Sequence, residues 1–428
     1  MLSLHKFFEL FKAIFALVYI ASTMGLLANL LIPYPRLEYA DEISSSFLFS
    51  WLALYLLTLF FLVLRPGAVL KKWNILFISI LALVLLSIVS FLWSSDAVNT
   101  LSYAGVLALN FLFCVWLVNE YPISRVVTII YRAIFIMVAC SVVLYIMGYS
   151  GVLYYDPHGR ETLLGTQPLR GLFNHKITAG LYAVFGFLLC MSLKRRVGRI
   201  AGCTMFAIFS ILSGSSAAIG LLVIGVVIYS CIKSMLYYRF SLGVFIAIVL
   251  LVPLTAVLTF ILAGEQLLSL LGRDPTLTGR TLLWGWGIEV ALQNVLLGWG
   301  YQGYMGTEHA ADYAQTIPQF VNYNVPHFHN AYIQIFVELG ILGLMLYLAV
   351  YFVVLARLYI LSSKTAFNFN CYAKFDSFLP LLASLTLLLV SSFFINTFFQ
   401  YNDFSTLLFF VSAVVVTREF VAKCTYCE

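Results

Sequence analysis

Apolar stretches of about 20 residues, the length that crosses a bilayer as a helix, follow one another along almost the whole chain of 428 residues. The expected spans are 13–32, 46–64, 74–93, 101–118, 126–147, 177–193, 200–212, 217–232, 240–262, 330–356, 377–398 and 405–417. This pattern predicts an all-α polytopic membrane protein with about 12 transmembrane helices.

The composition agrees with this pattern. Hydrophobic residues make up 62% of the chain and charged residues 10%, whereas a soluble domain carries about a quarter charged residues and under half apolar ones. A soluble globular enzyme is therefore excluded, and nucleic acid is not an expected partner. Residues 1–428 are predicted to form a single transmembrane bundle, in contact with membrane lipids.

Lysine and arginine are distributed unevenly between the loops. If the N-terminus is cytoplasmic, the loops on the other side hold only six of the 24 cations. These are Arg36, Arg160, Arg170, Lys176, Arg273 and Arg280. Since cytoplasmic loops carry an excess of Lys and Arg, both termini are expected in the cytoplasm.

Two outer segments, 148–176 and 263–329, are too long to be simple connections. Loops of that size usually carry function. Five of the six histidines lie in them, namely His158, His175, His309, His327 and His329. We therefore expect these two segments to form an active site at the outer face, where no ATP is present, and we expect no cofactor.

The second segment contains a turn followed by a helix that is expected to run from about Gly279 to Leu297, with Thr278 as a plausible N-cap. Arg280 falls in the first turn of this helix, where a cation opposes the helix dipole. A bound anion would resolve the conflict, because backbone N–H groups, the dipole and a guanidinium together form a phosphate site. The alternative is an ion pair between Arg280 and Asp274.

The first segment ends at Arg170 and Lys176, directly before a span. The positive-inside bias disfavours cations at this boundary, so a partner is expected. Snorkelling to lipid headgroups is the alternative, and it suits Lys176 better than Arg170. The sharper hypothesis is that Arg170 and Arg280 converge on one diphosphate.

His329 and Asn330 precede another span and should lie near its outer end. An imidazolium is disfavoured beside arginines and a positive helix end, so His329 is expected to be neutral and able to act as a general base. His327 and His329 could instead suggest a metal, but no compact carboxylate set accompanies them. Glu338 is expected two turns deeper, where it has either a function or a merely structural polar partner.

Three motifs now stand together: Arg170-Gly-x-Phe, the Gly-Arg-Asp-x-Thr-Leu-Thr-Gly-Arg-Thr-x-x-Trp run at 272–284, and His329-Asn followed by Glu338-Leu-Gly. In order, spacing and sidedness the chain resembles the O-antigen ligase and polysaccharide polymerase superfamily. It looks most like the succinoglycan-type exopolysaccharide polymerase branch. The resemblance implies a GT-C-like bundle with a large, partly helical periplasmic loop between spans 9 and 10.

The resemblance also implies a metal-independent glycosyltransferase of the bacterial inner membrane, with its active site in the periplasm. The donor would be an oligosaccharide on undecaprenyl diphosphate, and the acceptor a sugar hydroxyl on a lipid-linked glycan or on lipid A core. By this analogy Arg170 and Arg280 would hold the diphosphate and His329 would deprotonate the acceptor, with inversion.

Further residues are expected in supporting roles. Arg273 and Lys176 would add charge at the diphosphate, and His175, His327 and Asn330 would contact substrate. Two positions differ from the related polymerases: Ile177 stands where they have Asn, and Ser216 stands where they often have a cation. Aromatic residues of the large loop could stack on sugars or anchor at the interface, namely Tyr301, Tyr304, Tyr313, Phe320 and Tyr323.

Two other functional classes remain open. A transporter or flippase would suit twelve spans, although carriers usually place polar groups near the midplane and show two related halves. A non-catalytic assembly protein is the third class. Within the enzyme class the sequence favours a polymerase over a ligase, because of the 272–281 run.

Overall fold

The computed structural model describes residues 2–32, 45–64, 74–155, 161–162, 165–251, 255, 279–317, 325–366, 372–397 and 399–424. The longer helices are α1 (Leu2–Thr23), α3 (Ser45–Val63), α5 (Ile75–Val89), α6 (Ala97–Glu120), α7 (Ile123–Ile146), α8 (Lys176–Cys190), α9 (Arg196–Leu212), α10 (Ser216–Tyr237), α12 (Arg280–Gln293), α14 (Ala331–Ala366), α15 (Tyr372–Ser391) and α16 (Phe404–Cys424). The shorter ones are α2 (Leu26–Leu31), η2 (Ser90–Leu92), η3 (Ser150–Val152) and α13 (Glu308–Gln315). Within these ranges the pairing of extended backbone is limited to one bridge between Leu153 and Leu169. The predicted all-α class is confirmed for the described residues.

Within the described ranges, seven helices are long and apolar enough to cross a membrane: Ser46–Val63, Ile75–Leu92, Ala97–Glu120, Ile123–Ile146, Ser216–Tyr237, Ala331–Ala366 and Lys374–Ser391. Lys176–Cys190 and Leu242–Leu251 are apolar but shorter. The chain is therefore a multi-pass membrane protein. Helices α1, α9 and α16 also lie over expected spans but are not among the seven, so twelve crossings remains a prediction.

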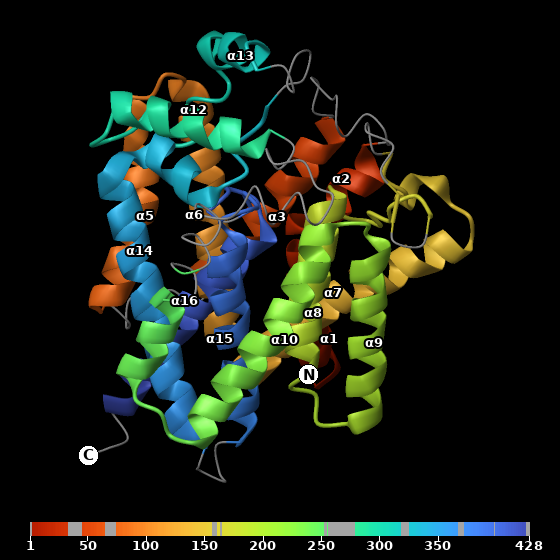
Figure 1. The fold of residues 1–428 in the computed structure, drawn as a ribbon. Coiled ribbons are helices and arrows are strands. Elements are labelled where there is room, and N and C mark those ends of the chain that lie inside the picture. Colours follow the sequence, from red (N-terminus) through yellow and green to blue (C-terminus); the bar gives the residue numbers. More distant parts are fainter. Residues whose placement is uncertain are drawn as a thin grey trace.

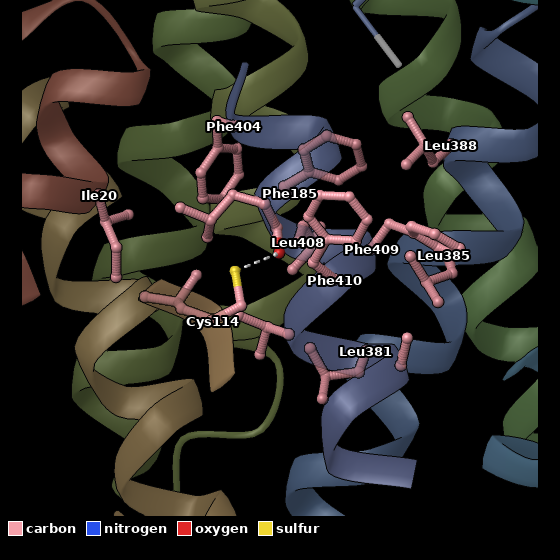
Figure 2. Packing of buried hydrophobic residues seen from close by; sticks show 14 of the residues in the cluster. Ile20, Cys114, Phe185, Leu381, Leu385, Leu388, Phe404, Leu408, Phe409 and Phe410 are labelled. Carbon is pink, nitrogen blue, oxygen red and sulfur yellow. Dashed lines mark hydrogen bonds between the residues drawn. The ribbon is translucent and has the colours of Figure 1, made fainter. Parts of the chain in front are cut away.

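The core forms where α6, α8, α14, α15 and α16 meet. Helix α15 contacts α7, α8, α10, α14 and α16, so it lies near the middle of the bundle. Figure 2 shows the side chains from α6, α8, α15 and α16 that interlock there. They include Cys114, Phe185, Leu385, Leu408 and Phe410, all of which are buried. This apolar centre holds the ends of the helices in fixed relative positions.

Helices α12 and α13 cover one end of the bundle, at the top of Figure 1. We call this the site end. The two marked termini lie in the opposite half of the molecule (Figure 1).

Helix α14 is interrupted at Gly340, whose φ of 65° and ψ of −169° are not helical. The segment 295–300, which follows α12, hydrogen-bonds across this break. Trp299 N–H donates to the carbonyl of Val337 (2.8 Å), and Gly300 N–H donates to that of Glu338 (2.9 Å). Ile341 N–H donates in turn to the carbonyl of Val295 (2.7 Å). The polar groups freed by the break are thus satisfied by protein, as membrane burial requires.

This pairing also explains a difference from the sequence prediction. Helix α12 ends at Gln293 instead of near Leu297, because residues 295–297 follow the break in α14. Its buried face consists of Leu283, Trp286 and Val290, whereas Leu297 is exposed. Gly279, with φ 81°, occupies the N-cap position, and Thr278 lies outside the described residues.

We predict that Gly340→Ala destabilises the protein. An added Cβ would press on the backbone of Leu296 and would have to adopt a left-handed conformation, which alone costs about 1–3 kcal/mol. The melting temperature of the purified protein in detergent measures the effect. Size-exclusion chromatography checks that each variant elutes as a monodisperse peak. Gly220→Ala is the matched control, because a Cβ there meets nothing within 4 Å and alanine favours a helix interior by about 1 kcal/mol. Equal melting temperatures for the two variants would contradict the prediction.

Candidate active site

The two histidines of the large loop lie next to each other at the start of α14. His329 has a positive φ of 53°, which turns the chain sharply just before the helix. Its N–H donates to His327 Nδ1 (3.2 Å), and the two rings stand 4.3 Å apart at 82°. Asn330 caps the helix, since its Oδ1 accepts from the N–H groups of Tyr332 (3.0 Å) and Ile333 (3.1 Å). We call residues 327–330 the histidine turn.

Both imidazoles are expected to be neutral at pH 7. Burial, followed by the charge of Arg280, lowers the pKa of His327 to about 4. Burial, followed by the charges of His327, Arg280 and His175, lowers the pKa of His329 well below 6.5. A neutral imidazole can accept a proton. The lowered pKa agrees with the neutral form expected for His329, and its role as a general base stays a prediction.

Arg280 lies beside the histidine turn. Its Nη1 donates to the carbonyl of Phe394 (3.1 Å), in the turn that follows α15. Ser392, in the same turn, accepts the N–H of Ala331 (2.9 Å), the first residue after the histidine turn. A Cβ on Gly287 of α12 would lie 2.9 Å from the Phe328 ring, so α12 packs directly on this turn.

The position of Arg280 partly answers the electrostatic conflict noted in the sequence. The carbonyl of Phe394 lies just past the C-terminal end of α15, where a helix carries partial negative charge. The guanidinium is thus held between this end and the N-terminus of α12. Asp274, the alternative partner, and Arg273, an expected phosphate ligand, lie outside the described residues.

A third element reaches the site through His175, which caps the N-terminus of α8. Its Nδ1 accepts the N–H of Ile177 (3.1 Å), and its Nε2 lies 3.1 Å from the hydroxyl of Tyr154. Because Nδ1 is an acceptor, the neutral tautomer carries its proton on Nε2. Lys176 is buried, with Nζ 5.0 Å from the centre of the Tyr154 ring. Ile177 thus takes part in the cap through its backbone.

Arg170 is held in a fixed position by three hydrogen bonds. Its Nη1 donates to Asn29 Oδ1 (2.5 Å) and to the carbonyl of Phe173 (3.0 Å), and its Nη2 donates to the carbonyl of Gly151 (2.8 Å). Only 2% of the residue is exposed. These three acceptors fix the orientation of the guanidinium.

The Arg-Gly-x-Phe motif has a local structural reason. Gly171 has a φ of 63°, and a Cβ there would collide with Ser141. The Ser141 hydroxyl accepts the N–H of Leu172 (2.9 Å), and Phe173 is fully buried. The glycine permits the tight turn, and the phenylalanine anchors it, so that the Arg170 guanidinium meets the carbonyl of Phe173.

The sequence did not indicate Asn29 or Tyr154. Asn29 lies in α2 and also donates through Nδ2 to the carbonyl of Leu172 (2.9 Å), so it ties the N-terminal region to the Arg170 turn. Its only sequence signal was one amide in the run Leu-Leu-Ala-Asn-Leu-Leu.

Two of the five loop aromatics proposed to stack on sugars are part of the protein core. Tyr301 is fully buried and donates to the carbonyl of Phe399 (2.9 Å), and Tyr304 is 3% exposed. The stacking interpretation is wrong for these two residues, since the interior buries their rings. Tyr313 stacks on Trp286 at 4.9 Å, and Phe320 and Tyr323 lie outside the described residues.

The part of the chain that the structure describes contains no group of three or more His, Cys, Asp or Glu side chains arranged to hold a metal ion. The candidate site is instead built from neutral imidazoles and cations.

Comparison with known proteins agrees with this arrangement. Residues 177–348 match the O-antigen ligase family. This stretch of the chain is thus similar to the O-antigen ligase family. It is also 31% identical over 213 residues to the exopolysaccharide production protein ExoQ of Rhizobium meliloti (strain 1021), which covers 46% of this chain and 47% of ExoQ. The chain therefore spans about half the length of this relative, and the resemblance inferred from the motifs is confirmed.

The region that matches the family runs from α8 to the middle of α14. It includes Arg280 and the histidine turn, while Arg170 and His175 lie immediately before it. The matched residues therefore include much of the candidate site.

We predict that Asn29 and Arg170 are energetically coupled. A double-mutant cycle with Asn29→Leu and Arg170→Leu should give a coupling of about 1.5–3 kcal/mol, the range for a hydrogen bond to a charged group. Unfolding by sodium dodecyl sulfate in mixed micelles measures the free energies. Asn99→Leu with Arg170→Leu is the control cycle, since Asn99 hydrogen-bonds to Asp96 instead. Additive effects in both cycles would contradict the prediction.

Proposed function

We propose that this protein is a membrane glycosyltransferase that moves an oligosaccharide from undecaprenyl diphosphate to a sugar hydroxyl at the outer, periplasmic face of the inner membrane. The observation that supports this most directly is the position of a neutral His329 beside the guanidinium of Arg280 at the site end. An alcohol nucleophile needs a base, and a diphosphate leaving group needs fixed positive charge.

In the proposed reaction His329 takes the proton of the acceptor hydroxyl while its oxygen bonds to the anomeric carbon. The bond from that carbon to the diphosphate oxygen breaks, and the electron pair leaves with undecaprenyl diphosphate. Attack from the opposite side gives inversion. Arg280 and the N-terminus of α12 stabilise the negative charge that develops on the diphosphate.

The remaining residues of the candidate site would have supporting roles in the transfer. Arg170 and Lys176 add positive charge from the direction of α8, and Arg273 adds charge from the loop. His175 and His327 bind substrate. Asn330 acts mainly by capping α14, which fixes the base. With cations in these roles, transfer needs neither a metal nor a nucleotide.

The acceptor is proposed to be another lipid-linked glycan, so that repeated transfer extends a polysaccharide. The similarity to ExoQ, named as an exopolysaccharide production protein, supports this choice. Ligation onto lipid A core is the alternative, and it uses the same groups on the donor.

One feature of the structure also occurs in carriers: an interrupted membrane helix with a buried carboxylate, here Glu338. In carriers the ends of such a break face the transported ion or substrate. Here Trp299, Gly300 and Val295 occupy the backbone groups at the break. The break therefore serves the protein's own packing, which favours the enzyme.

We predict that His329→Ala abolishes polymer or ligated product in cells, because loss of a general base costs about 10²–10⁴-fold in rate. Product is measured by gel and the protein by its abundance in membranes. His309→Ala is the control: His309 lies in the same loop but contacts Tyr304 (3.3 Å) instead of the histidine turn. Wild-type yield from His329→Ala would refute its role as the base.

We predict that kcat/KM falls on acidification only well below pH 6.5. His329 must be unprotonated in the free protein to act as the base, and its pKa is lowered well below 6.5. The Arg280 charge lowers the pKa of His329, so Arg280→Ala should shift the acidic limb of kcat/KM to higher pH. Arg280→Lys keeps the charge and should leave the limb in place, even if its rate is lower. An unchanged limb in Arg280→Ala would show that another group controls the profile.

A further inference from the structure

Glu338 has no role in the proposed reaction, yet it is 1% exposed and accepts two hydrogen bonds inside the membrane. Its Oε1 accepts from Gln334 Nε2 (2.7 Å) and from Gln302 Nε2 (2.8 Å). Burying such an acceptor costs free energy unless it receives hydrogen bonds.

Gln334 connects Glu338 to the histidine turn. Its Oε1 accepts the N–H of Phe328 (3.1 Å), the residue between His327 and His329. An amide side chain has a donor end and an acceptor end. Because Glu338 Oε1 accepts from the donor end, the acceptor end is directed at the histidine turn. If the amide were reversed, two acceptors would meet at Glu338 and two donors at Phe328.

Gln302 fixes Glu338 from the other side. It has a positive φ of 55°, and its Nε2 also contacts Gln400 Oε1 (3.1 Å). The main-chain carbonyl of Glu338 accepts the N–H of Gly300 (2.9 Å). Glu338 is therefore held at both its side chain and its backbone by the segment that pairs with the break in α14.

We propose that Glu338 is a positioning residue: as a hydrogen-bond acceptor it orients Gln334, which holds the backbone between His327 and His329 in the geometry that transfer requires. This inference rests on the proposed function for its kinetic consequences. Glu338 does not carry a proton in the reaction, and it acts on the base through one side chain and one peptide group.

Two substitutions separate this role from a general structural one. Gln334→Met and Gln302→Met each remove one donor from the same Glu338 oxygen, but only Gln334 contacts the histidine turn. We expect Gln334→Met to lower kcat by about 10–100-fold, as for a displacement of about 1 Å in a catalytic group, with the KM for the lipid-linked donor unchanged. Gln302→Met should keep kcat within about 2-fold. Equal loss in both variants, or a change confined to KM, would overturn the proposal.

A second pair tests what Glu338 itself supplies. Glu338→Gln keeps an acceptor oxygen for both amides and should retain most activity, whereas Glu338→Leu removes the acceptor and should behave like Gln334→Met. If Glu338→Gln is as inactive as Glu338→Leu, the charge is required and the positioning role is wrong. If Glu338→Leu fails to insert, the Gln334→Met result still decides.

A readout that needs no activity keeps the inference distinct from the proposed function. Diethyl pyrocarbonate modifies imidazoles, and mass spectrometry of the peptide that contains the histidine turn gives its rate of labelling. We expect faster labelling in Gln334→Met than in wild-type protein, and no change in Gln302→Met. An inactive wild-type protein with this labelling pattern would refute the glycosyltransferase but support the positioning role. Unchanged labelling in Gln334→Met would overturn the positioning role.

Discussion

The break in α14 determines the arrangement of the whole site end. A helix interrupted inside a membrane must have its freed carbonyl and N–H groups satisfied by protein, and the segment 295–300 does this through direct backbone pairing. A Cβ on Gly298 would lie 2.6 Å from backbone atoms of Glu338 and Gly340. The two backbone segments can therefore approach this closely only because residue 298 is a glycine. Because this segment follows α12 directly, the pairing fixes α12 against the start of α14. Arg280 is thereby brought to the histidine turn.

Electrostatics then determines the chemistry of the site. Burial and the charge of Arg280 disfavour a proton on His329, so the proposed base would be unprotonated near neutral pH. Arg280 would also attract a lipid diphosphate, whose negative charge would in turn raise the proton affinity of His329. Binding the donor would therefore make the base stronger at the moment it is needed. A metal at this position would compete with that arrangement, since it too would be a cation next to the imidazole.

Much of this arrangement could be predicted from the sequence. Hydropathy predicted the helical ranges, and the unfavourable location of Arg280 at a helix N-terminus pointed to the site. Contacts that depend on packing between distant segments could not be predicted from the sequence. Asn29 lies 141 residues from Arg170, its partner, and no local pattern connects them. The burial of Tyr301 and Tyr304 likewise follows from the segment paired with α14, whereas aromatic residues at an interface had suggested exposure. The early end of α12 has the same cause.

The most direct test of the central claim uses purified protein reconstituted in lipid with a radiolabelled oligosaccharide on undecaprenyl diphosphate, with and without a chelator. If a neutral histidine and fixed cations carry out the transfer, longer lipid-linked glycans and free undecaprenyl diphosphate should form to the same extent in both cases. If the label remains in the donor, or if the donor crosses the bilayer without reacting, the protein is not a glycosyltransferase of this kind.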